Sequence, residues 1–175
     1  ARLTQTFGAG VSNTDNRVFA QFARSVIDNT DIILHTEGNS AKPYCYTIDA
    51  VNAILHILLL GKNGEAYNVA NPNTYISIKD FAHFVKDNFA PNIEIIKNIP
   101  TNITYAPETK LNLDVSKLQQ LGWSPQYNLK EMFEQLKLGK TFFIRFSVKD
   151  SSSNTGSKQI TAKLDLADFA KALNY

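Results

Sequence analysis

Residues 42–55, KPYCYTIDAVNAIL, decide the fold, because a strand pattern turns into a helix pattern within them. In a strand, Tyr44 and Tyr46 lie on one face and Cys45 on the other. Hydrophobic residues then recur at the spacing of a buried helix face, at Val51, Ile54, Leu55 and Leu58. We expect Asp49 to cap the first free N–H groups of this helix. A strand that leads directly into a helix is typical of an α/β protein.

The same alternation continues on both sides of this stretch. Strands are predicted within residues 1–10, 31–38, 64–72 and 92–100, where short apolar runs are bounded by Gly, Pro or Asn. Helices are predicted after Asn16, Ser77, Asp114 and Asn128. Polar residues of this kind are favoured as N-caps, since their side chains accept hydrogen bonds from the first turn. Strands and helices in alternation favour a single α/β architecture for this part of the chain.

The character of the sequence changes after about Gly139. Residues 141–148, TFFIRFSV, and 159–164, QITAKL, read as strands, and a polar loop rich in Ser and Asn separates them. Asp165 is predicted to cap a terminal helix. We therefore divide the chain into residues 1–138 and a strand-strand-helix tail, 139–175, which is an added α/β tail or the start of a further domain.

Composition excludes several classes of function. The chain has 175 residues, 18 basic and 16 acidic, so a net charge of +2 predicts no nucleic-acid partner. A single cysteine, Cys45, excludes an internal disulfide framework, and no apolar run approaches a membrane span. We expect a cytoplasmic protein, and the start at Ala1 resembles a cut edge. The three histidines are scattered, so no metal site is predicted, and Cys45 is interpreted as a core residue.

Several segments, in this order and at these separations, resemble the C-terminal portion of the NAD-dependent epimerase/dehydratase family, whose members are extended short-chain dehydrogenases that act on nucleotide sugars. They are ARLTQTFGAG, IILHTEGNSAKPYCYTIDAVNAIL, GEAYNVANP and LNLDVSKLQQLGWSPQYNLKEMF. The resemblance covers about residues 1–138. It implies an α/β fold that is the C-terminal, substrate-binding portion of an extended Rossmann-type dehydrogenase.

The resemblance also implies three substrate-binding residues. Lys42 stands where the family usually has an Arg that reaches the substrate diphosphate, although a solvated loop lysine is the alternative reading. Gln5 matches a position where many relatives have an Asn near the sugar or phosphates. Arg17 begins the stretch that leads into the base-contacting loop and helix. A second phosphate-binding Arg is expected between residues 99 and 113, where Lys110 is the only basic residue. Tyr44 and Tyr46 are interpreted as packing residues.

In the family, the dinucleotide fingerprint and the catalytic Tyr-x-x-x-Lys pair lie upstream of the segment that resembles ARLTQTFGAG. The resemblance therefore implies no catalytic residue in this chain, and NAD only as a cofactor of the full-length enzyme. The predicted function is nucleotide-sugar binding within an NAD-dependent epimerase or dehydratase that can form a homo-oligomer. The alternative is a non-catalytic binding or interaction module derived from that fold.

Overall fold

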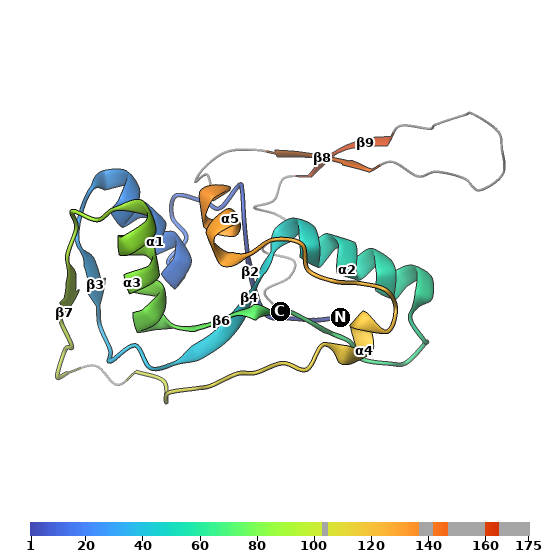
Figure 1. The fold of residues 1–175 in the computed structure, drawn as a ribbon, viewed down its shortest axis with the longest axis horizontal. Helices are drawn as coiled ribbons and strands as arrows, with labels where there is room; N and C mark the ends of the chain where they lie inside the picture. Colours follow the sequence, from blue (N-terminus) through green and yellow to red (C-terminus); the bar gives the residue numbers. More distant parts are fainter. Residues whose placement is uncertain (103–104, 137–141, 147–159, 165–175) are drawn as a thin grey trace.

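The computed structural model describes residues 1–102 and 105–136, together with the backbone of residues 142–146 and 160–164. The strands are β1 (Arg2–Leu3), β2 (Gln5–Phe7), β3 (Ile32–Leu34), β4 (Ala41–Tyr46), β5 (Asn68–Val69), β6 (Asn71–Ser77), β7 (Ile95–Lys97), β8 (Phe142–Phe146) and β9 (Ile160–Leu164). The helices are α1 (Val18–Asp28), α2 (Thr47–Leu60), α3 (Ile78–Phe89), α4 (Ser116–Gln119) and α5 (Leu129–Glu134) (Figure 1). The fold is therefore mixed α/β, as predicted.

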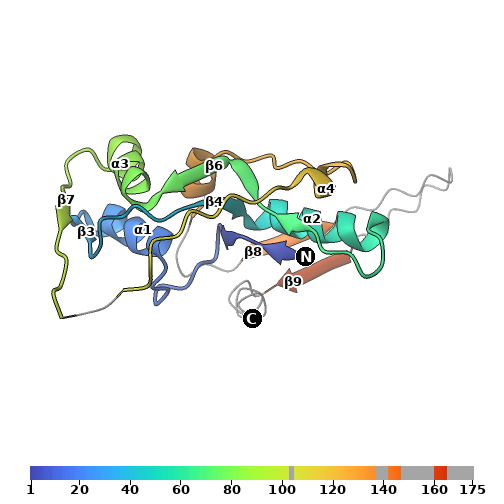
Figure 2. The ribbon, with the colours of Figure 1, turned by 90° about the horizontal axis from the view of Figure 1, so that it is seen from below.

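The central sheet has the strand order β2-β4-β6, with β2 parallel and β6 antiparallel to β4. Two smaller parallel pairs, β1–β5 and β3–β7, flank it. Both views show α1 and α3 at one end of the molecule and α2 and α4 at the other (Figures 1 and 2). No helix in the described ranges is long and apolar enough to cross a membrane.

The two faces of β4 separate two hydrophobic clusters. Tyr44 and Tyr46 are buried in the larger cluster, which the side chains of α1, α3 and α5 complete. Cys45 is buried on the opposite face, in a smaller cluster with Ala50 and Trp123. The predicted alternation of these three strand residues is therefore confirmed, and both tyrosines pack in the core, since Tyr44 is 1% and Tyr46 is 4% exposed.

The capping predictions were partly right. Ser77 accepts a hydrogen bond from the backbone N–H of Asp80, and Asn128 forms a capping box with Glu131. The prediction for Asn16 was wrong, because Arg17 is the N-cap residue of α1 and no side chain caps that helix. The short helix predicted after Asp114 is α4, and Gly122, which follows it, adopts a positive φ of 87°.

The prediction that Asp49 caps α2 was also wrong. Asp49 lies inside the first turn, since α2 begins at Thr47, and it is only 2% exposed. Its Oδ2 accepts hydrogen bonds from the backbone N–H groups of Gln126, at 3.1 Å, and Tyr127, at 3.2 Å. The carboxylate therefore joins α2 to the segment before α5, because burial requires polar partners and these two N–H groups supply them.

The buried face of α2 also differs from the prediction. Its buried apolar residues are Ala50 and Ala53, and Leu58, which was expected in the core, is 75% exposed. The strand β6 was not predicted, because its residues NPNTYIS begin with Asn, Pro and Asn, which are depleted in strands. In the tail, β8 and β9 form the two predicted strands as an antiparallel pair, and the helix predicted after Asp165 lies outside the described residues.

Candidate functional site

The structure places Gln5 and Lys42 on the same face of the central sheet. Gln5 is paired with Tyr44 on the neighbouring parallel strand, and Lys42 precedes Tyr44 by two residues. Residues two apart in a strand share a face, so both side chains lie on the face that carries Tyr44. A strand spacing of about 4.8 Å and a rise of about 3.3 Å per residue put their Cα atoms about 8 Å apart.

Lys42 has an uncommitted ammonium group. Within the part of the chain that the structure describes, Lys42 forms no ion pair and its side chain donates no hydrogen bond. The side chain is half-buried, and its backbone partner across the ladder is Ile76. A lysine stem that packs against apolar neighbours while its charge stays free is suited to an anionic ligand.

Residues 109–111 run beside the start of β4. The N–H of Ala41 donates to the carbonyl of Thr109 at 2.8 Å, and the N–H of Leu111 donates back to the carbonyl of Ala41 at 2.9 Å. Lys110 is thus the direct neighbour of Ala41 in an isolated parallel bridge. The segment in which a second basic residue is expected therefore lies beside Ala41, the residue before Lys42.

The turn that leads into β4 is fixed at the N-terminus of α3. The N–H groups of Lys79 and Ile78 donate to the carbonyls of Gly38 and Ser40, each at 3.0 Å. These N–H groups belong to the first turn, which has no partner within the helix. Gly38 has a φ of 71°, and a Cβ at this position would lie 3.0 Å from the backbone N of Lys79. A glycine is required there, and the entry of β4 is held in place.

Arg17 approaches the same face from the loop before α1. Its guanidinium lies 4.7 Å above the ring of Phe19, which stacks on Phe7 at 4.6 Å. Nε and Nη2 both donate to the Asp15 carboxylate. Burial acts to raise the pKa of Asp15, but its hydrogen bonds to Arg17 and the Arg17 charge outweigh this and lower that pKa below its ordinary value. Arg17 is therefore already paired, unlike Lys42.

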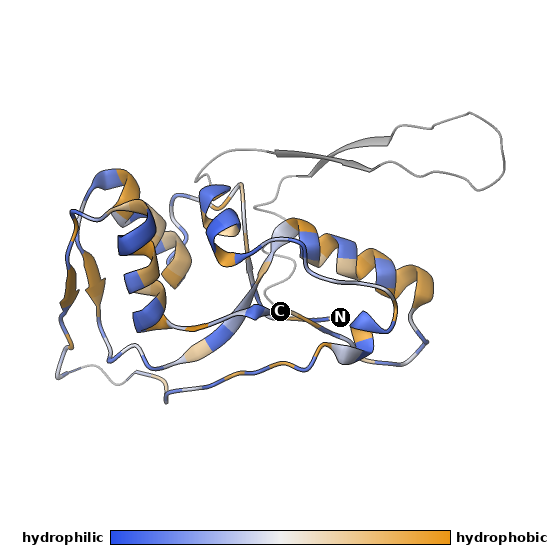
Figure 3. Ribbon diagram, in the orientation of Figure 1, coloured by the Kyte–Doolittle hydropathy of each residue, from blue (hydrophilic) through white to orange (hydrophobic). Residues whose placement is uncertain are grey.

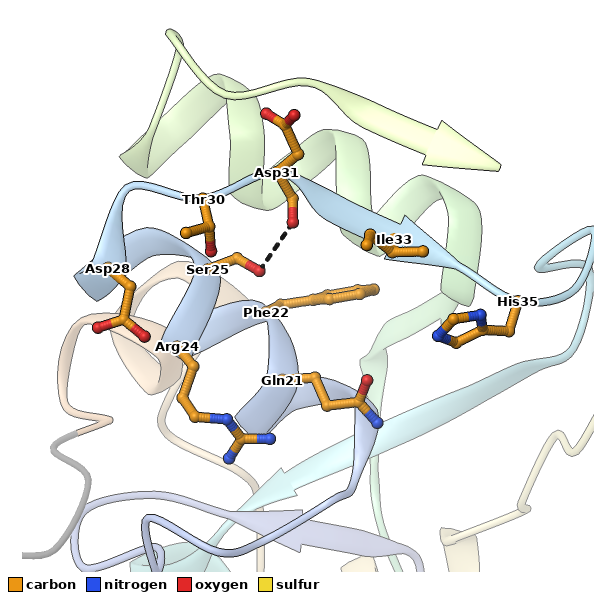
Figure 4. A pocket seen from close by; sticks show the side chains of 9 residues that line it. All are labelled: Gln21, Phe22, Arg24, Ser25, Asp28, Thr30, Asp31, Ile33 and His35. Atoms are coloured by element: carbon orange, nitrogen blue, oxygen red, sulfur yellow. Dashed lines mark hydrogen bonds between the residues drawn. The ribbon is translucent and has the colours of Figure 1, made fainter. Parts of the chain in front are cut away.

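A hollow that is open to solvent and about 320 Å³ in volume lies between α1 and β3. Figure 4 shows Gln21, Arg24 and Asp28 projecting from α1, with His35 following β3. None of the three predicted substrate-binding residues lines it. Arg24 is committed to the carbonyls of Asn13 and Asp15. No pattern in the sequence indicated this hollow, because its walls come from separate elements.

The buried titratable groups on β4 are unsuited to acid-base chemistry. Burial raises the pKa of the Tyr44 phenol, and burial together with the Asp49 charge raises the pKa of the Cys45 thiol. Both groups therefore stay protonated at neutral pH. Among the described residues, no group of three or more His, Cys, Asp or Glu side chains is arranged to hold a metal ion.

The spacing Tyr-x-x-x-Lys occurs once, at Tyr75 and Lys79. Tyr75 lies in β6 and Lys79 in α3, so the two residues do not share a helix face as residues at i and i+4 would. Lys79 Nζ instead donates to Asn39 at 3.2 Å. Tyr75 and Lys79 therefore match the motif in spacing only, and they do not form a pair on one helix face.

Comparisons with known proteins agree on one family. A family model described as the NAD dependent epimerase/dehydratase family matches residues 1–70. The UDP-D-apiose/UDP-D-xylose synthase of Oryza sativa subsp. japonica is 26% identical over 71% of the chain and 35% of its own length. The human dTDP-D-glucose 4,6-dehydratase is 25% identical over 66% of the chain and 34% of its own length. The chain thus spans about a third of the length of these curated relatives.

The fold of this chain is also similar to that of solved epimerases. One such structure is the UDP-glucuronic acid 4-epimerase of Bacillus cereus, solved in complex with UDP-glucuronic acid and NAD. The match covers 77% of the present chain and 42% of the epimerase chain. The TM-score is 0.63 and the sequence identity is 19%. The described part of the chain therefore has the architecture of one portion of a Rossmann-type epimerase.

Proposed function

Because this chain belongs to the NAD-dependent epimerase/dehydratase family, we propose that it is the nucleotide-sugar-binding part of an NAD-dependent enzyme that modifies nucleotide sugars. The names of the curated relatives support a nucleotide sugar as the substrate class, because each name contains a UDP- or dTDP-linked sugar. In this proposal residues 1–138 hold the substrate, and the tail from residue 139 has a separate role.

Lys42 is the residue that carries the proposal. Its ammonium group has no partner among the described residues, and it shares a sheet face with the Gln5 amide. A diphosphate needs a positive charge, which Lys42 supplies, and hydrogen-bond donors, which the Gln5 side-chain amide supplies. Lysine acts as a point charge rather than a bidentate fork, so the diphosphate is held without strict orientation.

Arg17 has a supporting role in this proposal. Asp15 and the ring of Phe19 hold its guanidinium in a fixed orientation, and no hydrogen bond from its Nη1 to a described residue is formed. A guanidinium fixed in this way loses little entropy when it binds a further acceptor. We assign it a contact with the nucleotide rather than with the sugar.

In this proposal, residues 1–138 do not carry out the redox step. The sequence has no G-x-G-x-x-G turn, which would bind the pyrophosphate of NAD, and its one Tyr-x-x-x-Lys spacing does not form a helical pair. NAD supplies hydride transfer in such enzymes. Residues 1–138 then contribute binding energy and orientation for the sugar that reacts elsewhere.

A calorimetric titration with UDP-glucuronic acid tests the proposal. We expect binding to the chain, and we expect Lys42→Ala to weaken it about tenfold, or about 1.4 kcal/mol. Lys130→Ala is the matched control, because Lys130 is exposed on α5 and makes no ion pair with a described residue. Equal affinity in the Lys42→Ala variant, or no binding by the unsubstituted chain, would reject the proposed role of this site.

A further inference from the structure

The connection between α2 and β5 contains the only Asn-Gly pair of the sequence, Asn63-Gly64. The N–H of Glu65 donates to the carbonyl of Lys62 at 3.3 Å, so Asn63 and Gly64 are the two central residues of a β-turn. Gly64 has a φ of 78°, which a glycine adopts without steric cost. Both residues are exposed, and Figure 3 shows hydrophilic residues where the chain leaves α2. The pair therefore lies at the tip of an exposed turn.

The contacts of this turn are made on either side of its tip. The N–H of Lys62 donates to the hydroxyl of Tyr67 at 3.0 Å, and the carboxylate of Glu65 forms an ion pair with Lys117 of α4. Within the described residues, neither the side chain of the asparagine nor the N–H of the glycine at the tip forms a hydrogen bond. No atom lies within 4 Å of the place where a Cβ of the glycine would be. The side-chain amide and the backbone nitrogen that follows it are therefore both uncommitted and accessible.

We infer that Asn63 is a site of spontaneous covalent modification, at which the asparagine converts to aspartate and isoaspartate through a cyclic imide. The backbone nitrogen of Gly64 forms a bond to Cγ of Asn63. The bond from Cγ to Nδ2 breaks, and Nδ2 leaves as ammonia with the proton that the Gly64 nitrogen gives up. The absence of a Cβ at Gly64 favours this step, because a side chain there would crowd the attacking nitrogen.

Water opens the five-membered imide ring in one of two ways, and no oxidation or reduction takes place. Attack at Cγ restores the ordinary backbone and gives aspartate, and the ring nitrogen regains its proton. Attack at the main-chain carbonyl of Asn63 leaves the chain running through Cγ, which gives isoaspartate. Either product adds one negative charge between Lys62 and Glu65, and isoaspartate also lengthens the main chain of the turn by one methylene.

Asn92 provides a matched control within the same molecule. It is also exposed in a turn, but the next residue is Ile93, whose β-branched side chain crowds the backbone nitrogen. The N–H of Ile93 also donates to the carbonyl of Ala90 at 3.2 Å, so the nitrogen that would attack is engaged. Asn92 should therefore remain an asparagine while Asn63 converts.

Incubation of the full chain at pH 8 and 37 °C, followed by pepsin digestion at low pH and peptide mass spectrometry, tests the inference. Digestion at low pH keeps the amide nitrogen protonated, so conversion does not continue during the digestion. We expect Asn63 to convert at least tenfold faster than Asn92, and we expect isoaspartate among the products. Gly64→Ala should slow the conversion at least tenfold, because its Cβ hinders the attack.

Equal rates at Asn63 and Asn92 in the unsubstituted chain overturn the inference. Aspartate without isoaspartate also overturns it, because direct hydrolysis of the side-chain amide gives aspartate alone. A Gly64→Ala variant that converts as fast as the unsubstituted chain rejects the attack by the backbone nitrogen. The first two outcomes are read from the unsubstituted chain, so they do not depend on the folding of the variant.

Discussion

Thr74 completes the hydrogen bonding of Tyr44 at the point where the ladder between β4 and β6 loses its register. The ladder shifts between Lys42, which is paired with Ile76, and Tyr44, which is paired with Asn71. The N–H of Tyr44 donates to Thr74 Oγ1 at 2.8 Å, and this hydroxyl in turn lies 2.8 Å from the carbonyl of Tyr44 and 2.7 Å from that of Asn71. One buried hydroxyl therefore holds the strand that carries Lys42.

The first prediction is that Thr74→Val destabilises the protein by about 1–3 kcal/mol, because the buried N–H of Tyr44 is left without an acceptor. Thr74→Ser keeps the hydroxyl and should cost less than about 1 kcal/mol, mostly through the lost methyl group. Urea unfolding followed by tryptophan fluorescence measures both variants, since Trp123 is buried. A loss in Thr74→Val that is no larger than the loss in Thr74→Ser would contradict the role of the hydroxyl.

The second prediction concerns the pH dependence of stability. Burial raises the pKa of Asp49 above its ordinary 3.8, although the N–H groups of Gln126 and Tyr127 act in the opposite direction. The folded state therefore holds the proton more tightly than the unfolded state. Asp49 contributes its full stability below about pH 3.8 and loses it as the pH rises through the folded pKa.

Asp49→Asn tests this sign, because a single amide oxygen can accept both of the hydrogen bonds that now reach Oδ2. Relative to the unsubstituted chain, the variant should gain unfolding free energy between pH 4.5 and pH 8, by about 1.4 kcal/mol for each unit by which the folded pKa is raised. Urea unfolding at both pH values measures the difference. A gap that stays constant with pH would contradict the raised pKa.

Local patterns predicted much of this fold. The alternation of Tyr44, Cys45 and Tyr46 needs only the period of a strand, and the caps at Ser77 and Asn128 need only residues three positions away. Each of these features is determined by a few consecutive residues, so the sequence was sufficient to find them.

The errors arose where the partner is distant. Asp49 was read as a cap because a carboxylate at a helix start usually is one, but its true partner, Gln126, lies 77 residues away. The spacing that ends at Leu58 predicted a buried face, although the inner side of α2 consists of alanines. A helix that is apolar on several sides has no unique stripe. Likewise, no local pattern could place residues 109–111 beside Lys42.

The third prediction is that Gly38→Ala destabilises the protein more than Gly64→Ala. Both glycines have a positive φ, 71° and 78°, so each alanine carries the left-handed penalty of about 1–2 kcal/mol. Only at Gly38 does the new Cβ also press on the backbone of Lys79, since nothing lies within 4 Å at Gly64. Urea unfolding should show a further loss of at least about 1 kcal/mol at Gly38. Equal losses would mean that the turn yields without cost.

The fourth prediction follows from the chemistry of the Lys42 side chain. Lys42→Arg should bind UDP-glucuronic acid about fivefold more tightly, or about 1 kcal/mol, because a guanidinium contacts two phosphate oxygens at once. Raising the salt concentration from 50 to 500 mM should weaken binding by the unsubstituted chain and by Lys42→Arg more than it weakens the residual binding of Lys42→Ala, which keeps only Arg17 as a charged contact. Calorimetry measures all three. If the affinity of the unsubstituted chain did not depend on salt, the ammonium group of Lys42 would not contact a phosphate, and the half-buried lysine on β4 would serve only to cover Ile76.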